Sequence, residues 1–418
     1  MSESIPEESR AGDHSPEEPT AFLFATGIEC SYPVIRNGSY RVDELQSTRH
    51  YQHWREDLLL TSDLGIRVLR YGVPYYRVNT NPGVYDWSFL DEVLAEMRLL
   101  RIEPILDLCH FGMPSWLGNS FQNQEFPQAF AIYARAVAER YPWVRLYTPI
   151  NEMYVCAKFS AQEGWWNEQE KSERAYVTAT RNLAKASRLA MSEIAKVKPD
   201  AVFIQSEASE QIHTVCGCAE NRKRVDWENQ LRFLSLDLLY GHHVRTDVHT
   251  CLMDHGMSQE EYRWFMNDGL ESRCVMGNDY YAGNERILQH DGSVTNQGEI
   301  FGWYLVTRQY YERYRKPIMH TETNNSGSGD AVEWLWKQWQ NVLYARAEGI
   351  PVLGFTWFSL TDQVDWDTQL REANGTVNAW GLYDLDRKIR PVGEAYRQLI
   401  KEFSWLPIVP NGDFFGVT

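Results

Sequence analysis

Two glutamates carry the chemistry that the sequence indicates most directly. Glu152 closes segment 144–152 (Val-Arg-Leu-Tyr-Thr-Pro-Ile-Asn-Glu), and Glu322 closes segment 317–322 (Pro-Ile-Met-His-Thr-Glu). Each follows a short apolar run typical of a strand, and in a parallel α/β barrel the carboxyl ends of all strands meet at one face. Two facing carboxyl groups can cleave a glycosidic bond, because one protonates the leaving oxygen and the other attacks the anomeric carbon. We therefore predict a catalytic pair rather than two surface glutamates.

Regular elements that could position this pair recur along the chain. The runs that predict strands are short and mostly apolar, as expected for strands covered on both faces. They lie at residues 21–28, 66–71, 103–109, 144–150, 201–206, 274–280, 317–321 and 351–357. Amphipathic patterns between them predict helices, the clearest at 89–100, 174–197, 332–347 and 392–403. Eight strands alternating with helices indicate the α/β class and a (β/α)8 TIM barrel.

We expect this barrel to form a single domain over residues 21–405. Residues 1–20 are rich in Glu, Ser and Pro and are predicted to be a disordered acidic tail. Residues 406–418 are interpreted as a C-terminal tail. The long connection between the fifth and sixth strands, 207–273, is interpreted as an insertion that forms part of the barrel mouth.

The composition narrows the classes of partner. The net charge of −16 argues against nucleic acid and against anionic membrane surfaces. The chain has no run of 18 uninterrupted apolar residues and no signal-like N-terminus, and its seven cysteines are scattered. A cytoplasmic protein without disulfides and with a small-molecule partner is expected. The 16 Trp and 23 Tyr suit a sugar site, although most of these rings should fill the core.

A group of histidines and cysteines in the insertion could suggest a metal site. Its members are His213, Cys216, Cys218, His242, His243, His249, Cys251 and His255. The Cys-Gly-Cys spacing is too tight for an ordinary zinc knuckle, and no second Cys-x-x-Cys follows. We therefore predict no metal and no organic cofactor.

Polar and aromatic residues close several of the other predicted strands. Arg70 ends the second, His110 the third and Trp357 the eighth, while Asn151 precedes Glu152 and Tyr281 follows the sixth strand. With the two glutamates they form an ordered set of strand-end residues. In this order the chain resembles the family 1 glycoside hydrolases (β-glucosidase-like), barrel enzymes with catalytic glutamates on strands four and seven. The resemblance covers residues 21–404.

Four segments carry the resemblance. Residues 148–152 (Thr-Pro-Ile-Asn-Glu) look like the family's acid/base segment, and Thr321-Glu322 looks like its nucleophile segment. Residues 112–117 and 359–366 look like its loops after the third and eighth strands. Several residues depart from the pattern in ways that alter the sugar-binding shell. They are Met153 for proline, Thr323-Asn324 for Asn-Gly, Asp279 for asparagine, Glu29 for a sugar-binding glutamine, Phe358 for tryptophan and Asp365 for a sugar-binding glutamate.

The resemblance and the charges imply roles for the site residues. Glu322 must be ionised to attack, with Arg70 and the Tyr281 hydroxyl as its expected partners. Glu152 must start protonated, which burial and the charge of Glu322 would favour. Asn151 is expected to donate to the sugar 2-hydroxyl. The remaining sugar contacts are predicted for His110, Glu29, Asp365, Trp366 and, as an aromatic platform, Trp357.

The expected activity is that of a retaining exo-β-glycosidase acting on a small β-glucoside or β-galactoside. Alternatives are a transglycosylase with the same glutamates, a catalytically silent sugar-binding barrel, and a metal-dependent hydrolase using the His/Cys-rich insertion. A phosphoglycosidase is less well supported, because no Ser-x-Lys-x-x-x-Tyr cluster follows the eighth strand. The sequence leaves the glycone, the aglycone and the oligomeric state open.

Overall fold

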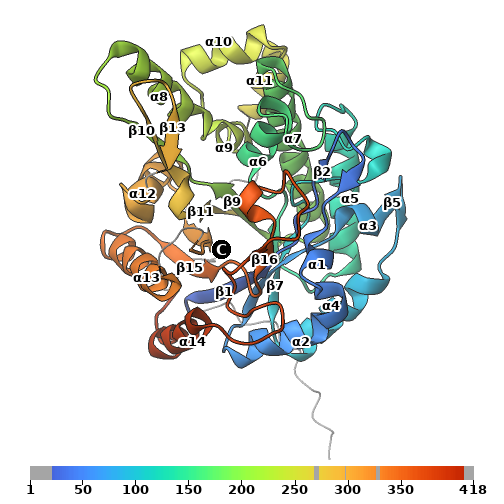
Figure 1. Cartoon of the computed structure of the whole chain (residues 1–418). Coiled ribbons are helices and arrows are strands. Elements are labelled where there is room, and N and C mark those ends of the chain that lie inside the picture. The colour runs from blue at the N-terminus through green and yellow to red at the C-terminus, as the bar shows by residue number, and fades with distance from the viewer. Residues whose placement is uncertain (1–20, 268–272, 297, 326–329, 409–418) are drawn as a thin grey trace, which may run out of the picture.

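The computed structural model describes residues 21–267, 273–296, 298–325 and 330–408. Eight parallel strands close into a barrel, and helices surround it (Figure 1). The predicted barrel is therefore confirmed, and each predicted strand has a counterpart. The strands are β1 (Leu23–Ile28), β4 (Val68–Gly72), β7 (Glu103–Asp107), β8 (Leu146–Thr148), β9 (Val202–Ala208), β11 (Cys274–Asp279), β14 (Ile318–Glu322) and β15 (Val352–Trp357). β1 closes the barrel by pairing with both β4 and β15.

The helices that cover the barrel begin and end at recognisable signals. Ser172 caps its helix by accepting a hydrogen bond from the Ala175 N–H, and Pro391 occupies a first-turn position where no donor is needed. The predicted helices correspond to α4 (Ser88–Leu99), α7 (Glu173–Val197), α13 (Ala331–Ala347) and α14 (Pro391–Phe403). The others of the outer layer are α2 (His50–Asp63), α5 (Phe126–Arg140), α9 (Leu234–Leu239) and α12 (Gly302–Tyr314). None of the helices in the described ranges is long and apolar enough to cross a membrane.

The barrel interior is apolar at one end and polar at the other. One buried cluster includes strand residues such as Val68, Ile105 and Leu353, and Ile408 packs into the same cluster. Pro407 forms a bridge with Ala21, so residues 406–408 lie against the barrel, although they were predicted to begin a tail. The two tails predicted at 1–20 and 406–418 otherwise lie outside the described residues. Because apolar side chains fill this end, the functional groups are concentrated at the carboxyl ends of the strands.

The insertion predicted between the fifth and sixth strands folds into elements of its own. It contains β10 (Gln211–Thr214), α8 (Ala219–Leu231), α9, α10 (Thr246–Asp254) and α11 (Gln259–Phe265). β10 pairs with β12 (Glu285–Leu288), which pairs in turn with β13 (Val294–Asn296). This small sheet contributes Arg286 and Asn296 to the wall of the cavity described below.

Candidate active site

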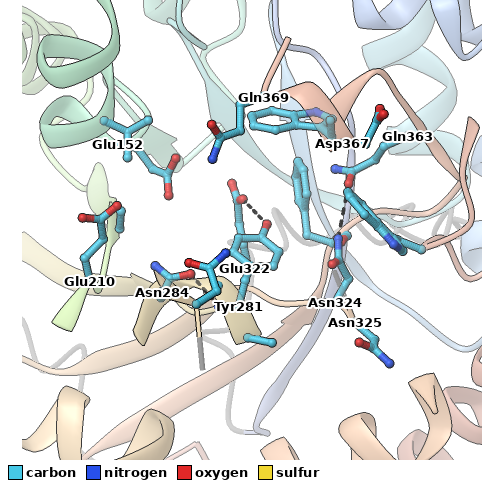
Figure 2. A pocket seen from close by; sticks show the side chains of 18 of the residues that line it. Glu152, Glu210, Tyr281, Asn284, Glu322, Asn324, Asn325, Gln363, Asp367 and Gln369 are labelled. Atoms are coloured by element: carbon cyan, nitrogen blue, oxygen red, sulfur yellow. Dashed lines mark hydrogen bonds between the residues drawn. The ribbon is translucent and has the colours of Figure 1, made fainter. Parts of the chain in front are cut away.

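A cavity of about 1010 Å³ opens at the carboxyl ends of the strands. Its volume is at the upper end of the range for small-molecule sites. Six of the ten predicted site residues line it: Glu29, His110, Glu152, Tyr281, Glu322 and Trp366. Figure 2 shows the side chains of Glu152, Tyr281 and Glu322 pointing into the same space from different segments of the chain. The strand-end prediction therefore brings together residues that are far apart in the sequence.

Glu322 is the last residue of β14 and is held by one donor on each carboxylate oxygen. The Arg70 guanidinium donates to Oε1, and the Tyr281 hydroxyl donates to Oε2 over 2.6 Å. Burial alone would lower the pKa of Arg70, but the negative charges of Glu322 and Asp107 outweigh it and raise the pKa. Arg70 is therefore a permanent cation beside Glu322, and the two donors fix the orientation of the Glu322 carboxyl group.

Arg70 also connects Glu322 to a second set of buried groups. Its Nη2 donates to Asp107 Oδ2 over 2.9 Å and to Asn151 Oδ1 over 2.5 Å. Asp107 Oδ2 lies 2.6 Å from His110 Nδ1, and His110 Nε2 lies 3.1 Å from Asn151 Nδ2. This arrangement fits a neutral imidazole that donates from Nδ1 and accepts at Nε2. Neither Arg70 nor Asn151 is among the residues that line the cavity; both lie behind its wall.

Glu152 lies in a different environment. It follows β8 by four residues and precedes α6 (Met153–Ala157) in a left-handed conformation with φ of 40°, so it does not itself close the strand as predicted. Burial raises its pKa well above the ordinary glutamate value, and the negative charges of Asp279, Glu322 and Glu207 raise it further. Surroundings of this kind favour the protonated form of the Glu152 carboxyl group. The two carboxyl groups are thus suited to opposite tasks.

Asp279 stands where the resemblance leads one to expect asparagine. It pairs with Glu322 in the register of β11 and β14 and is fully buried. Its carboxyl group accepts from Ser206 Oγ over 2.7 Å and from Thr321 Oγ1 over 2.5 Å. Burial, followed by the charge of Glu322, raises the pKa of Asp279. Asp279 therefore places another acidic group next to Glu152 and Glu322, but its side chain does not line the cavity.

Two predicted sugar-binding residues occupy unexpected positions. Trp357 is fully buried and its indole N–H donates to the Trp380 carbonyl over 3.0 Å, so it does not line the cavity. Side chains alternate along a strand, and Phe355 on the same face packs against the helix layer. The next residue, Phe358, lines the cavity instead. Its ring lies so close to β1 that a Cβ on Gly27 would approach it to 2.3 Å, which requires glycine there.

Asp365 is the second of these residues, and its carboxylate faces its own loop. It accepts from the backbone N–H groups of Asn374 and Gly375, each over 3.0 Å, and of Thr376 over 2.8 Å. Asp365 is absent from the residues that line the cavity. Gln363, two residues earlier in β16 (Gln363–Val364), lines the cavity and donates to Glu29 Oε2 over 2.7 Å. Sequence reasoning missed Gln363 because it depends on the loop conformation.

A charged cluster on the other side of Glu152 was also missed. Lys158 Nζ lies 2.9 Å from Glu210 Oε2, and Arg286 pairs with the same oxygen. Burial would raise the pKa of Glu210, but these two cations lower it to about 2. All three residues line the cavity, beside Phe159 and Trp165. Lys158 begins the helical turn Lys158–Gln162 after α6, Glu210 lies in the β9–β10 connection and Arg286 in β12, a combination without any signal in the sequence.

The His/Cys-rich insertion does not supply the side chains that lie close enough together to hold a metal ion in the described residues. Among residues 21–267, 273–296, 298–325 and 330–408, the group close enough to hold a metal ion consists of Cys30, Asp107 and His110. Asp107 already pairs with the Arg70 guanidinium there. Because Arg70 supplies the positive charge beside Asp107, we assign these side chains to the Arg70 network.

Comparisons with known proteins point to one family. The family model described as glycosyl hydrolase family 1 matches residues 38–233. The chain is 22% identical to 6-phospho-beta-glucosidase AscB of Escherichia coli, over 88% of this chain and 86% of that protein. It is 21% identical to Beta-glucosidase A of Thermotoga maritima, over 84% of this chain and 86% of that protein. The solved structure of the family 1 β-glucosidase from Thermotoga maritima superposes with a TM-score of 0.77 at 17% identity, covering 93% of this chain and 99% of that one.

Proposed function

Because this chain is a member of glycosyl hydrolase family 1, a family of glycoside hydrolases, we propose that it removes a terminal β-linked sugar by a retaining double displacement. In this proposal Glu322 is the nucleophile and Glu152 the acid/base. The observation that supports it best is the unequal environment of the two carboxyl groups. Glu322 is held between a cation and a hydroxyl, whereas burial and three acidic neighbours raise the pKa of Glu152. The proposed glycone is a neutral hexose such as glucose or galactose.

The first step transfers the sugar to the enzyme. A Glu322 carboxylate oxygen bonds to the anomeric carbon while the glycosidic C–O bond breaks and the Glu152 proton moves to the leaving oxygen. Arg70 and Tyr281 hold the attacking carboxylate in place. This positioning lowers the entropic part of the activation free energy for attack on the anomeric carbon. Asn151 lies behind the cavity wall, so in this proposal it positions Arg70 and His110 and does not contact the sugar 2-hydroxyl itself.

The second step releases the sugar. Once Glu322 is esterified its negative charge is gone, which removes one of the charges that raise the pKa of Glu152. Glu152, now ionised, takes a proton from water as the water oxygen bonds to the anomeric carbon and the bond to Glu322 breaks. The configuration at the anomeric carbon is retained after the two inversions.

The test is nitrophenol release from a panel of aryl β-glycosides (gluco, galacto, fuco, manno, xylo). Glu322→Gln should reduce kcat/KM for the preferred sugar by at least about 10⁴-fold, because the amide cannot form the glycosyl ester. Glu299→Gln is the matched control, since Glu299 lines the same cavity and pairs with Lys337 instead. NMR of the first-formed sugar should show the β anomer.

Two outcomes would replace the proposal. If the folded wild type turned over none of the sugars yet bound deoxynojirimycin in calorimetry, the silent sugar-binding barrel would take its place. If added alcohol or sugar acceptors captured most of the glycosyl groups at millimolar concentration, the transglycosylase would be favoured. Sustained turnover that depends on Glu322 and yields free sugar in water supports hydrolysis.

A further inference from the structure

We infer that the glycone is read by Gln363 together with Glu29, rather than by Asp365, and that this pair selects an uncharged, hydroxyl-bearing sugar. The inference rests on the proposed function, because it assigns one end of the cavity to the glycone. It differs from the sequence-based expectation, in which Asp365 has the role of a sugar-binding carboxylate.

The position of Glu152 identifies the glycone end. Because Glu152 protonates the leaving oxygen, the aglycone must lie on its side of the anomeric carbon. Figure 2 shows Glu152 and Glu210 on one side of Glu322, and Gln363 and Asn324 on the other. Gln363 therefore faces the sugar ring that Glu322 attacks.

Gln363 is held in a fixed orientation by buried partners. It is 4% exposed, its Nε2 donates to Glu29 Oε2 over 2.7 Å, and its Oε1 accepts from Asn324 Nδ2 over 3.3 Å. Asn324 is itself fixed, because Nδ2 also donates to the Phe358 carbonyl over 2.8 Å. These contacts connect the loop after the nucleophile strand to β16 and to the end of β1. The wall at this end of the cavity is therefore preorganised.

Asp365 cannot serve the same purpose in this conformation. Its two carboxylate oxygens accept three backbone N–H groups from residues 374–376, which close the loop after β16. To reach a sugar it would have to abandon all three hydrogen bonds. Glu29, by contrast, lines the cavity one residue beyond β1 and is in direct contact with Gln363.

The side chains of Glu29 and Gln363 are complementary to a sugar hydroxyl in hydrogen bonding. Glu29 Oε1 accepts from the Ser31 N–H over 3.0 Å and from Ser31 Oγ over 2.5 Å, while Oε2 accepts only the Gln363 amide among the described contacts. A lone pair on Oε2 and the second Nε2 hydrogen of Gln363 remain, so the pair offers one acceptor and one donor. A sugar hydroxyl is both a donor and an acceptor, and it satisfies both groups.

The charges at this end disfavour an anionic sugar. Glu44 lies behind Glu29, and burial together with the Glu29 charge raises its pKa. The cations that line the described part of the cavity are engaged elsewhere: Lys158 and Arg286 pair with Glu210, and Lys337 pairs with Glu299. A phosphate or carboxylate on the glycone would therefore meet a carboxylate acceptor without a compensating cation, a costly arrangement in a buried site.

The experiment compares variants of Gln363, Gln369 and Asp365. Gln363 and Gln369 line the cavity, whereas Asp365 does not. For each, kcat/KM is measured with 4-nitrophenyl β-glucoside, β-galactoside and β-glucoside 6-phosphate, and Tm is recorded. Gln363→Ala should lower kcat/KM for the preferred epimer by at least about tenfold and reduce the gluco/galacto ratio. Gln369→Ala, another glutamine lining the cavity but outside this network, should keep the ratio. Asp365→Asn should lower Tm while keeping the ratio.

Each result has a defined meaning. A ratio that follows Asp365 and ignores Gln363 overturns the assignment, and a wild type that prefers the phosphorylated glucoside overturns the charge argument. If no substrate is turned over, the proposed function fails on its own, and calorimetry with deoxynojirimycin then tests the pair. Weaker binding in Gln363→Ala than in Gln369→Ala supports it, whereas equal binding, or no binding by the wild type, overturns it.

Discussion

The Tyr281 hydroxyl donates to Glu322 Oε2 over 2.6 Å, while the hydroxyl of the adjacent Tyr280 points away and donates to Glu285 over 2.7 Å. Two neighbouring tyrosines thus serve different carboxylates. Arg70 supplies the positive charge on the opposite oxygen of Glu322. The rotation of the Glu322 carboxylate is therefore restricted from both sides, which in the proposed mechanism favours a constant angle of attack on the anomeric carbon.

Removing only the Tyr281 hydroxyl should therefore affect catalysis. A hydrogen bond to a charged group contributes about 1.5–3 kcal/mol, so Tyr281→Phe should lower kcat/KM for an aryl β-glycoside by roughly ten- to a hundredfold. Tyr280→Phe is the matched control, because it removes a buried hydroxyl from the adjacent residue without touching Glu322. Tyr280→Phe should lower Tm, and it should reduce kcat/KM less than Tyr281→Phe does. Equal losses of kcat/KM in the two variants would show that the contact has no specific role.

Glu152→Gln should separate substrates by their leaving groups. With phenyl β-glycoside, whose leaving oxygen needs a proton, loss of the acid should lower kcat/KM by about 10²–10⁴-fold. With 2,4-dinitrophenyl β-glycoside it should change little, because this phenolate leaves without protonation. Added azide should then accelerate turnover, since it attacks the glycosyl ester without needing a general base. The control Glu163→Gln alters another carboxyl group on the cavity wall. A loss that is independent of the leaving group would assign the acid role to a different residue.

The pH profile follows from the raised pKa of Glu152. Burial is the main cause, and the charges of Asp279 and Glu322 add to it. The first step needs the protonated form, so kcat/KM is retained below this pKa and is lost as pH rises through it. The alkaline limb should consequently lie above the ordinary glutamate range. Asp279→Asn removes a neighbouring acidic group and should move this limb to lower pH, whereas Asp365→Asn should leave it in place.

The raised pKa of Glu152 also makes the free energy of unfolding depend on pH. The unfolded chain ionises Glu152 at the ordinary glutamate pKa, before the folded chain does, so the stability that this group contributes is lost as pH rises towards the folded value. Chemical denaturation at several pH values, compared with Glu152→Gln, measures this contribution. A denaturation midpoint that falls equally steeply with pH in both proteins would contradict it.

The barrel, and the position of Glu152 and Glu322 at one cavity, could be predicted because they depend on local patterns. Each barrel strand is a short apolar run, and Glu322 closes one of them. The spacing of apolar residues and the place of Glu322 at a strand end are therefore enough to predict both. Asp107 could have been noticed too, as an acidic residue inside an apolar strand. The wall proposed for the glycone could not be predicted, because the direction of Asp365 depends on a left-handed backbone (φ of 57°) and on three N–H groups nine to eleven residues away. Trp357 and Phe358 are adjacent, and only the backbone decides which one faces the cavity.

The cluster of Lys158, Glu210 and Arg286 gives a prediction for the aglycone. Glu210 compensates two cations at once, and all three side chains are largely buried. Glu210→Gln would remove the carboxylate that pairs with both cations and should lower Tm. It should also raise kcat/KM for a 4-carboxyphenyl β-glycoside relative to the 4-nitrophenyl one.

The expected gain is about tenfold, equivalent to one charge-assisted hydrogen bond of roughly 1.5 kcal/mol between the substrate carboxylate and the released cations. Glu163→Gln makes the same change of charge on the same wall, and Glu163 acts on Arg286 only through its charge in the described structure. It should therefore give a smaller gain. If both variants raised the ratio equally, the general field of the cavity would account for the effect, and the pairing of Glu210 with Lys158 and Arg286 would not control aglycone choice.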